Sequence, residues 1–576
     1  MIPAFRLRFP ARPRLPLTEA GGPPGDPRAG RAGLPAVAAA LLLAGLPLGF
    51  IAVEAVAGRL GLGLLGDGRV LQAGLNTLVT ALASTVAALV LGGGAALLAG
   101  LTDLPGRRGF AALALLPMLI PSQIAALAWG RAFDPAGPLA RVLGLGGFGP
   151  NPLESAWGVW LVMGVEHMPI AFLAVIGAVT RIPAEPAEAA RVAGAGPAAA
   201  LAVAARPLVA PALAAAAALS LVSAAGNFGV PALLGIPGDY PVLSTLIYQC
   251  LSGFGPAALS EAAALAGLLG LGTLGLLRLQ SLMAGRAARV ADGSRLVPRL
   301  ALGRRRRQIA GAAWMLMIAL SLLPLAALVA ASLVPAPGVP LTAATASLDG
   351  YRAALDLRHG AGGAVITSAW LALVTALVSV AVALPLGLLA ARGAPAARLA
   401  AGGFDLALAL PGTVFAIGVI LAFLPPLPGI GLTLYGTPAI LLAAYLGRFP
   451  GLVLAPVRAA AERLDPAPEQ AARLAGAGFP ARIRVGAWPA LAGPAAGGAL
   501  LVLLTAFNEL TLSALLWSRG AETVGVAIYA RQAEGDSAGA AALSVVALAA
   551  ALGLAGLAFR MIARLPGLES AFGDRP

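Results

Sequence analysis

The chain has 576 residues, of which 59% are hydrophobic and 11% are charged, and its formal net charge is +14. The apolar residues lie in long runs, which excludes a soluble globular protein of this length, because such a protein needs far more polar residues to cover its surface. The single cysteine, Cys250, excludes an intramolecular disulfide and a paired-cysteine metal or redox site. We therefore expect an all-α polytopic membrane protein, whose backbone polar groups are satisfied within helices.

All 39 basic residues are arginines, and they lie between the apolar runs. A nucleic-acid-binding protein instead clusters its basic residues on a polar domain with groove-reading or aromatic residues nearby, so no nucleic-acid partner is predicted. The two histidines, His167 and His359, are far apart in the sequence and lack the spacing of metal ligands. No metal site is predicted.

A helix that crosses the hydrocarbon core of a bilayer needs about 20 mostly apolar residues. By this criterion we predict twelve spans, at 34–56, 74–100, 109–130, 156–180, 208–227, 259–281, 309–333, 364–390, 399–423, 437–460, 490–514 and 541–563. The first span follows a long segment with six arginines, which favours a retained anchor over a cleaved signal peptide.

The distribution of arginine predicts the orientation, because arginine is retained on the cytoplasmic side. With the N-terminus inside, 31 of the 39 arginines fall in cytoplasmic segments and 8 on the opposite side. We therefore expect a multi-pass protein of the bacterial inner membrane with both termini in the cytoplasm, and we interpret the run Arg304–Arg307 as a topology anchor. The expected division is a cytoplasmic tail at 1–33, a transmembrane domain at 34–281, an arginine-rich cytoplasmic linker at 282–308, a second transmembrane domain at 309–563 and a cytoplasmic tail at 564–576.

Two predicted cytoplasmic loops align without gaps at an offset of 282 residues. The aligned residues are Glu188, Ala189, Ala190 and Gly194 with Gln470, Ala471, Ala472 and Gly476, and then Pro207 with Pro489, each proline thirteen residues after its glycine. The same offset pairs Asn227 with Glu509, and Pro121 and Pro411 interrupt the third and ninth spans. Each half is therefore predicted to be one copy of a six-span unit. Since six is even, the two copies run parallel through the membrane.

These loops resemble the signature of type I ATP-binding-cassette (ABC) importer permeases: Glu-Ala-Ala, a glycine four residues after the second alanine, and a proline thirteen residues beyond it. The resemblance covers nearly the whole chain, twice, and is closest to the fused permeases of the ferric-iron group. It departs at Gln470, where the signature has glutamate. The segments that carry the iron-group resemblance are Phe228–Gly235, Val242–Tyr248, Glu509–Leu516 and Glu522–Gly525. The resemblance implies a MetI-like fold of about twelve helices in two parallel six-helix repeats.

The resemblance also implies partners. Short helices at about Pro186–Ala193 and Pro468–Ala475 would dock into two copies of a cytoplasmic ATPase subunit, and a periplasmic binding protein would deliver the substrate. The chain has no lysine and hence no P-loop, so the partner subunits would use the ATP, and this chain is predicted to bind no cofactor and to have no catalytic residues. The alternative interpretation of these segments is a pair of ordinary amphipathic loop helices.

Polar residues within apolar spans are expensive in lipid and are candidates for function. The candidates are Glu166, His167, Arg448, Asn508 and Glu509. They would line a central path, or else form an ion pair such as Glu166 with Arg448, or cap a helix.

Two other classes of protein share some of these features. An ion-gradient-driven secondary transporter would also have twelve spans in two parallel halves, but it has no need of two matched docking loops. An intramembrane enzyme would need a catalytic pair, whereas Glu166 and His167 are adjacent and point to different sides of a helix. Within the importer interpretation, ferric iron is the expected substrate, and thiamine, a polyamine or a phosphonate is the alternative.

Overall fold

The computed structural model describes residues 27–56, 66–137, 149–253, 258–284, 299–356, 361–426 and 431–563, with a few isolated positions between these ranges. Within them the regular structure is helical, apart from an isolated bridge between Thr102 and Leu300. Residues 1–26, 285–296 and 564–576, which make up most of the predicted tails and linker, lie outside the described part of the chain, as does His359.

Ten helices among the described residues are long and apolar enough to cross a membrane, or eleven if one bent pair is counted as a span. This confirms the predicted all-α polytopic membrane fold. The ten are Leu34–Glu54, Gly68–Leu101, Ala156–Val179, Pro197–Ala225, Ala258–Ser281, Gly303–Ser332, Gly362–Ala391, Pro438–Ala461, Trp488–Phe507 and Ser537–Arg560.

The predicted third and ninth spans are broken helices. In the third, Arg107–Leu119 and Ser122–Phe133 meet at an angle of 110°. In the ninth, α17 (Pro395–Ala409) ends before Pro411 and α18 (Gly412–Phe423) begins after it, so the helix over the predicted 399–423 is interrupted at Pro411, where the sequence predicts the break. Proline lacks an N–H and forces the preceding residue into an extended conformation, as Leu410 shows with ψ of 149°.

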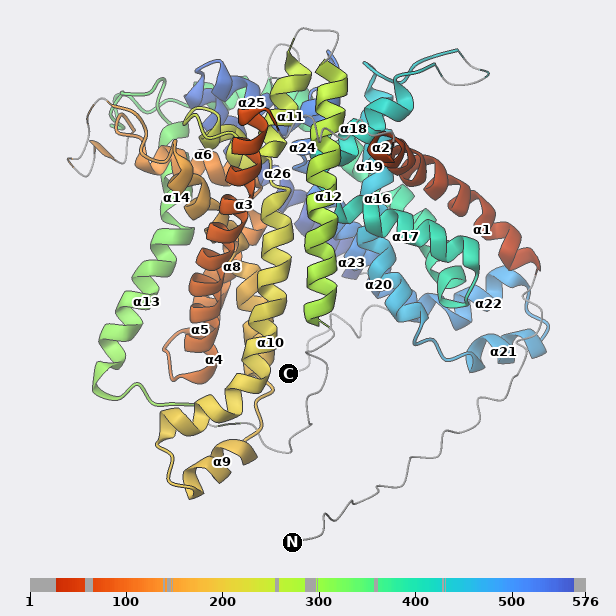
Figure 1. Ribbon diagram of the computed structural model, residues 1–576, viewed down its shortest axis with the longest axis horizontal. Helices are drawn as coiled ribbons and strands as arrows, with labels where there is room; N and C mark the ends of the chain where they lie inside the picture. The colour runs from red at the N-terminus through yellow and green to blue at the C-terminus, as the bar shows by residue number, and fades with distance from the viewer. Residues whose placement is uncertain are drawn as a thin grey trace.

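The order of helices in the first half of the chain recurs in the second (Figure 1). The first half contains α3 (Gly68–Ala88), α4 (Gly94–Leu101), α5 (Arg107–Leu115), α6 (Ser122–Phe133), α8 (Ala156–Val179), α9 (Glu185–Val192), α10 (Pro197–Ala225), α11 (Leu243–Ser252) and α12 (Ala258–Ala284). The second half contains α15 (Asp349–Leu355), α16 (Gly362–Ala391), α17, α18, α19 (Pro438–Arg448), α20 (Pro450–Ala461), α21 (Ala467–Leu474), α22 (Phe479–Gly486), α23 (Trp488–Phe507), α24 (Thr511–Leu516), α25 (Val524–Ala533) and α26 (Ser537–Ala563).

The first span of each half packs against the other half. The first span of the chain is α1 (Pro27–Ala40), a π-helical turn and α2 (Leu46–Val56), and it lies beside α16, α17 and α18, whereas α13 (Arg306–Ser321) and α14 (Leu323–Ser332) lie beside α5 and α6 (Figure 1). The contact is close at Gly447, where a Cβ atom would lie 2.3 Å from the backbone oxygen of Leu43. Small residues permit such backbone approach between membrane helices.

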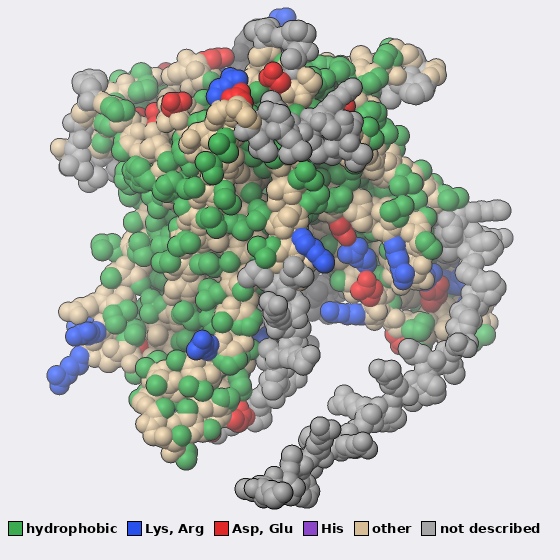
Figure 2. All heavy atoms as spheres, viewed as in Figure 1, with side chains coloured by type: hydrophobic (Ala, Val, Ile, Leu, Met, Phe, Trp, Pro, Cys, Tyr) green, Lys and Arg blue, Asp and Glu red, His purple; other side chains and the backbone are tan. Residues whose placement is uncertain are grey.

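Hydrophobic side chains cover the middle of the visible face, and many of the visible arginines lie toward the end that carries α9 and α21 (Figure 2). The helices α11, α24 and α25 lie at the opposite end (Figure 1). This separation along the helix axes is that of a membrane protein, with an apolar belt and a basic end.

Candidate functional site

Two short helices extend from the basic end of the molecule, one from each half. They are α9 and α21, and their bounds agree within one residue with the predicted Pro186–Ala193 and Pro468–Ala475. Each ends at a glycine with positive φ, +91° at Gly194 and +77° at Gly476, a conformation that glycine adopts without the penalty of a Cβ atom. The glycine of each aligned loop therefore makes the sharp turn that the sequence predicts.

Each of these helices exposes one large apolar side chain next to its C-terminal turn. Val192 is 92% exposed and Leu474 is 90% exposed, the two highest values among the described large apolar side chains. They are 282 residues apart and so occupy the same position in the two aligned loops. The neighbouring residues of the aligned motif are Glu188, Ala189, Gln470 and Ala471, which are exposed, and Ala190 and Ala472, which are partly buried. Two matched apolar residues are thus presented on a polar surface.

The two loops differ after the glycine. In the first half α10 begins at Pro197, so Pro207 lies inside a continuous helix rather than at the start of the next span. In the second half α22 ends at Gly486 and α23 begins at Trp488, so Pro489 lies in the first turn of α23, where its missing N–H costs nothing. The signature proline therefore has a different structural position in each half.

Glu166 of α8 is held by neutral donors from its own half. Ser122 Oγ donates a hydrogen bond to the carboxylate, and the side-chain amide of Asn227 donates to its two oxygens at 3.1 and 3.3 Å. Among the described ion pairs none joins Glu166 to Arg448, and Arg448 is instead attracted electrostatically to Glu509. The ion pair of Glu166 with Arg448, considered from the sequence, is therefore not formed.

Asn227 and Glu509, which the repeat aligns, make the same contact in their halves. Asn227 Oδ1 accepts a hydrogen bond from the backbone N–H of Val230, and Glu509 Oε1 accepts one from that of Leu512. Each side chain thus satisfies a free N–H at the start of the short helical segment that follows. Each half places one carboxylate here, Glu166 on α8 in the first and Glu509 at the turn in the second.

The remaining predicted path residues have separate partners. His167 is 3% exposed, and its two ring nitrogens contact the backbone oxygen of Met163 at 2.7 Å and Ser223 Oγ at 2.9 Å. Asn508 Nδ2 donates to Leu504 O at 3.1 Å, whereas Asn508 Oδ1 is buried without a partner. His167 is therefore fully bonded inside the first half, and Asn508 lies at the contact between the halves.

The broken spans meet the turns after α10 and α23 with complementary side chains. In the first half, a Cβ atom on Gly229 would lie 3.0 Å from the Ser122 side chain. In the second half the glycine lies on the broken span and the larger residue lies on the turn: a Cβ atom on Gly412 would lie 2.7 Å from the Thr511 side chain. The repeat aligns Ser122 with Gly412 and Gly229 with Thr511, so each half has one small and one larger residue at this contact.

An aromatic cluster joins the halves near α11 and α25. Phe228 and Tyr248 of the first half contact Tyr529 of the second, with ring centroids 6.5 and 5.8 Å away, and the Tyr248 and Tyr529 rings are nearly perpendicular. Edge-to-face pairs of this kind are attractive beyond the area that they bury. The cluster closes the contact between the halves at the end opposite α9 and α21 (Figure 1).

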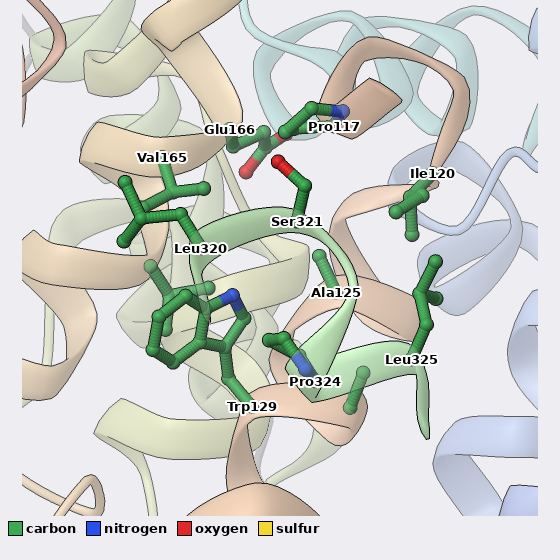
Figure 3. A pocket seen from close by; sticks show the side chains of 12 residues that line it. Pro117, Ile120, Ala125, Trp129, Val165, Glu166, Leu320, Ser321, Pro324 and Leu325 are labelled. Carbon is green, nitrogen blue, oxygen red and sulfur yellow. The ribbon is translucent and has the colours of Figure 1, made fainter. Parts of the chain in front are cut away.

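A small pocket lies beside Glu166, where the bend between α5 and α6 meets α8 and the junction of α13 with α14 (Figure 3). Glu166 and Ser321 provide the acidic and hydroxyl groups of its lining, and Trp129 and Leu320 are among its apolar residues. Ser321 Oγ donates a hydrogen bond to the backbone oxygen of Leu113 at 2.9 Å. In a regular helix this oxygen would accept from the N–H of residue 117, but Pro117 has no N–H. The second half's first span thus helps to stabilise the bend in the first half.

The sequence predictions did not assign a site role to Ser122, Gln123 or Asn227, although each lies in a segment that the repeat aligns. Their place in segments that recur in both halves was the sequence signal that could have pointed to them. Among the described residues, no group of three or more His, Cys, Asp or Glu side chains is arranged to hold a metal ion.

The fold and these contacts define the class of protein, a multi-pass helical membrane protein with paired helices extending from one end. Residues 383–565 match the family described as "Binding-protein-dependent transport system inner membrane component". The chain is also 29% identical over 472 residues to the "Probable ABC transporter permease protein y4fN" of Sinorhizobium fredii, an alignment that covers 78% of this chain and 80% of that protein. The chain is thus similar to membrane components of transport systems, one of which is described as a probable ABC transporter permease.

Proposed function

We propose that the chain is the permease subunit of an ABC importer in the bacterial inner membrane, with two fused six-span domains and both termini in the cytoplasm. In this proposal two copies of a separate ATPase subunit bind α9 and α21, and a periplasmic binding protein delivers the substrate at the opposite end. The chain itself holds no nucleotide, because it has no lysine from which to build a P-loop.

The observation that carries the proposal is the pair of exposed residues Val192 and Leu474. Covering an apolar side chain that is nine-tenths exposed with a partner protein lowers the free energy, because apolar surface is removed from water. Two such residues at one aligned position, each on a short helix ended by a positive-φ glycine, fit two identical partner surfaces. A gradient-driven carrier, the second class considered, would have no use for this duplication.

The contacts between the halves suggest how the transport cycle proceeds. Phe228, Tyr248 and Tyr529 close the halves at the end proposed to face the periplasm, while α9 and α21 lie apart at the other end (Figure 1). In this conformation a central path would be open toward the cytoplasm. Closure of the two ATPase subunits would bring α9 and α21 together and open the aromatic contact, an alternation of access by rigid-body movement.

We propose ferric iron as the substrate. Glu166 and Glu509 are half-buried carboxylates, one in each half, and hard carboxylate and amide oxygens suit a hard cation. Thiamine and polyamines are also cations and remain alternatives, whereas a phosphonate would be repelled by carboxylates. Among the described ion pairs none includes Glu166, whose carboxylate accepts hydrogen bonds from the neutral groups of Ser122 and Asn227.

The test uses cells that lack the gene, complemented with wild type or with Val192→Asp/Leu474→Asp. We expect wild type to restore uptake of labelled ferric iron, and the double variant to accumulate normally in the membrane but to lose uptake by at least about tenfold, because a buried aspartate at each contact is strongly unfavourable. Arg181→Ala, an exposed change just before α9, is the matched control. Restored uptake of labelled thiamine instead of iron would replace the substrate, and full uptake by the double variant would refute the ATPase-coupled function.

A further inference from the structure

The linker between the halves returns to the first half before it enters α13. Leu300 N–H donates to Leu101 O at 2.8 Å, and Asp103 N–H donates to Leu300 O at 3.2 Å, which forms the bridge between Thr102 and Leu300. Val297 N–H donates to Ile182 O at 3.0 Å, just before α9 begins at Glu185. We term Val297 and residues 299–306 the strap. It is bonded to the turn after α4 and to the loop that leads into α9.

Asp103 fastens the C-terminal end of the strap. Its Oδ1 accepts a hydrogen bond from Leu302 N–H at 2.9 Å, and its Oδ2 lies 3.3 Å from Arg306 Nε. Arg306 Nε also donates to the backbone oxygen of Asp103 at 3.1 Å. One carboxylate therefore holds both the backbone of the strap and the first residue of α13.

The attachment continues along α13. Trp314 Nε1 donates to Pro105 O at 3.1 Å. Gly106 has φ of +69°, and a Cβ atom there would lie 2.8 Å from the Trp314 ring, so only glycine leaves room for the indole. The turn after α4 is thus held between the strap and a helix that belongs to the second half of the chain.

The corresponding turn of the second half is joined to its docking helix directly. Arg392, at the end of α16, forms an ion pair of 2.5 Å with Glu469 on α21. The aligned residues of the first half are Thr102 and Ala187, which have no charge with which to form this pair. In the first half the strap instead joins the turn after α4 to the loop that leads into α9, through backbone hydrogen bonds to residues 101–103 and to Ile182.

From these contacts we infer that the strap ties the first docking helix, α9, to α13, so that a displacement of α9 reaches the first span of the second half, with Asp103 as the positioning residue. The inference rests on the proposed function, in which the ATPase displaces α9. Attachment at Ile182, Leu101, Asp103 and Pro105 makes the strap and these loops one continuous bonded unit, which is the physical requirement for mechanical coupling between two sites.

The first test is amide hydrogen exchange on the purified full-length chain. Leu300→Pro removes the N–H that bonds Leu101, and Asp103→Ala removes the acceptor for Leu302 and Arg306. We expect exchange of the amides in 101–106 and in α9 to rise by at least about tenfold in both variants, since loss of local bonds lowers the free energy of local opening. Arg304→Ala, which changes an exposed neighbour in the same basic run, should leave exchange unchanged.

The second test is the number of substrate ions taken up per ATP hydrolysed, in vesicles that contain the complete transporter. We expect this ratio to fall by about fivefold or more in Leu300→Pro, Asp103→Ala and Arg306→Ala, to stay normal in Arg304→Ala and to be largely kept in Arg306→Lys. Faster exchange at α9 with an unchanged ratio, or unchanged exchange, would overturn the inference. Failure of wild type to show any ATP-dependent uptake would instead overturn the proposed function.

Discussion

Gln123 in the first half donates a hydrogen bond from Nε2 to the backbone oxygen of Asn508 in the second half, at 2.9 Å. A related contact with the halves exchanged is that of Pro411, two residues before the position aligned with Gln123, with Gly226, where a Cβ atom on the glycine would lie 3.3 Å from the proline. The repeat aligns Gly226 with Asn508 and places Pro411 opposite Pro121. The break in each half therefore lies against the turn that follows α10 or α23 of the other half.

The hydrogen bond of Gln123 should contribute measurably to stability. The side chain is 3% exposed, so Gln123→Ala leaves the Asn508 oxygen without this donor, and we expect a loss of about 1–2 kcal/mol in unfolding free energy. Thermal unfolding of the purified protein measures the change. Gln72→Ala, which removes an exposed glutamine bonded to Asn76, is the control. An equal loss of unfolding free energy in both variants would show that the hydrogen bond between the halves adds no more stability than an exposed one.

The close contact at Gly447 should tolerate no larger residue. A Cβ atom would lie 2.3 Å from Leu43 O and 2.9 Å from the Phe415 ring, so Gly447→Ala must separate the first span from α19. We expect destabilisation of about 2 kcal/mol or more, in the range of overpacked cores. Gly402→Ala, in α17 with open space around its Cα, should be neutral in the same unfolding assay. Equal stability of the two variants would refute this contact.

The turn after α9 should depend on the backbone angle of Gly194 rather than on space. No atom lies within 4 Å of a Cβ placed there, but φ is +91°, so Gly194→Ala should cost about 1 kcal/mol and change the direction of α9. Gly196→Ala, with φ of −64° and equal space, is the control. Uptake should fall in the first variant and not in the second; normal uptake in both would remove the turn from the mechanism.

The complementary pair Gly412 and Thr511 allows a double-mutant cycle. Gly412→Ser alone places a side chain against Thr511 and should destabilise the protein by about 1–3 kcal/mol. Gly412→Ser/Thr511→Gly reproduces the combination of Ser122 with Gly229 and should recover at least half of that loss. Denaturant or thermal unfolding of Gly412→Ser, Thr511→Gly and the double variant gives the coupling energy. If the two single effects simply add, the pair Gly412 and Thr511 does not pack in the way that Ser122 and Gly229 do.

Glu166 should be needed for transport beyond its contribution to stability. Glu166→Gln replaces the acceptor of Ser122 and Asn227 with a neutral amide, and we expect uptake of a cationic substrate to fall by about tenfold or more at normal protein levels. Glu154→Gln changes an acid outside the spans and serves as the control. Normal uptake by Glu166→Ala, Arg448→Ala and Glu509→Ala alike would exclude these side chains from the path.

Much of the fold could be read from the sequence because it depends on local properties. Apolar runs predicted the long helices, Pro121 and Pro411 predicted the breaks, and the aligned loops predicted α9 and α21 within one residue. These features follow from helix length in lipid, from the missing N–H of proline and from the positive φ available to glycine. The angle between the two parts of a broken helix, 110° in the third span, could not be predicted, because an apolar run of sufficient length does not show how far its helix bends.

The partners of the buried polar residues could not be read from the sequence. The hydrogen bonds of Glu166 with Ser122 and Asn227, and of Gln123 with Asn508, join residues that are 44 to 385 positions apart. The repeat aligned several of these segments, yet an alignment equates positions in the two halves and does not show which positions touch.

By itself, the amino-acid sequence determined the class of fold, the basic end, the repeat and the two short helices α9 and α21, since each depends on composition and on spacing along one helix. Only the tertiary structure decided that the first span of each half packs on the other half, that the linker returns to bond Asp103, and that Glu166 and Glu509 each accept hydrogen bonds within their own half. These arrangements depend on which helix surfaces fit closely enough to bring backbones together, as Gly447 and Leu43 do, and that fit is a property of two surfaces at once.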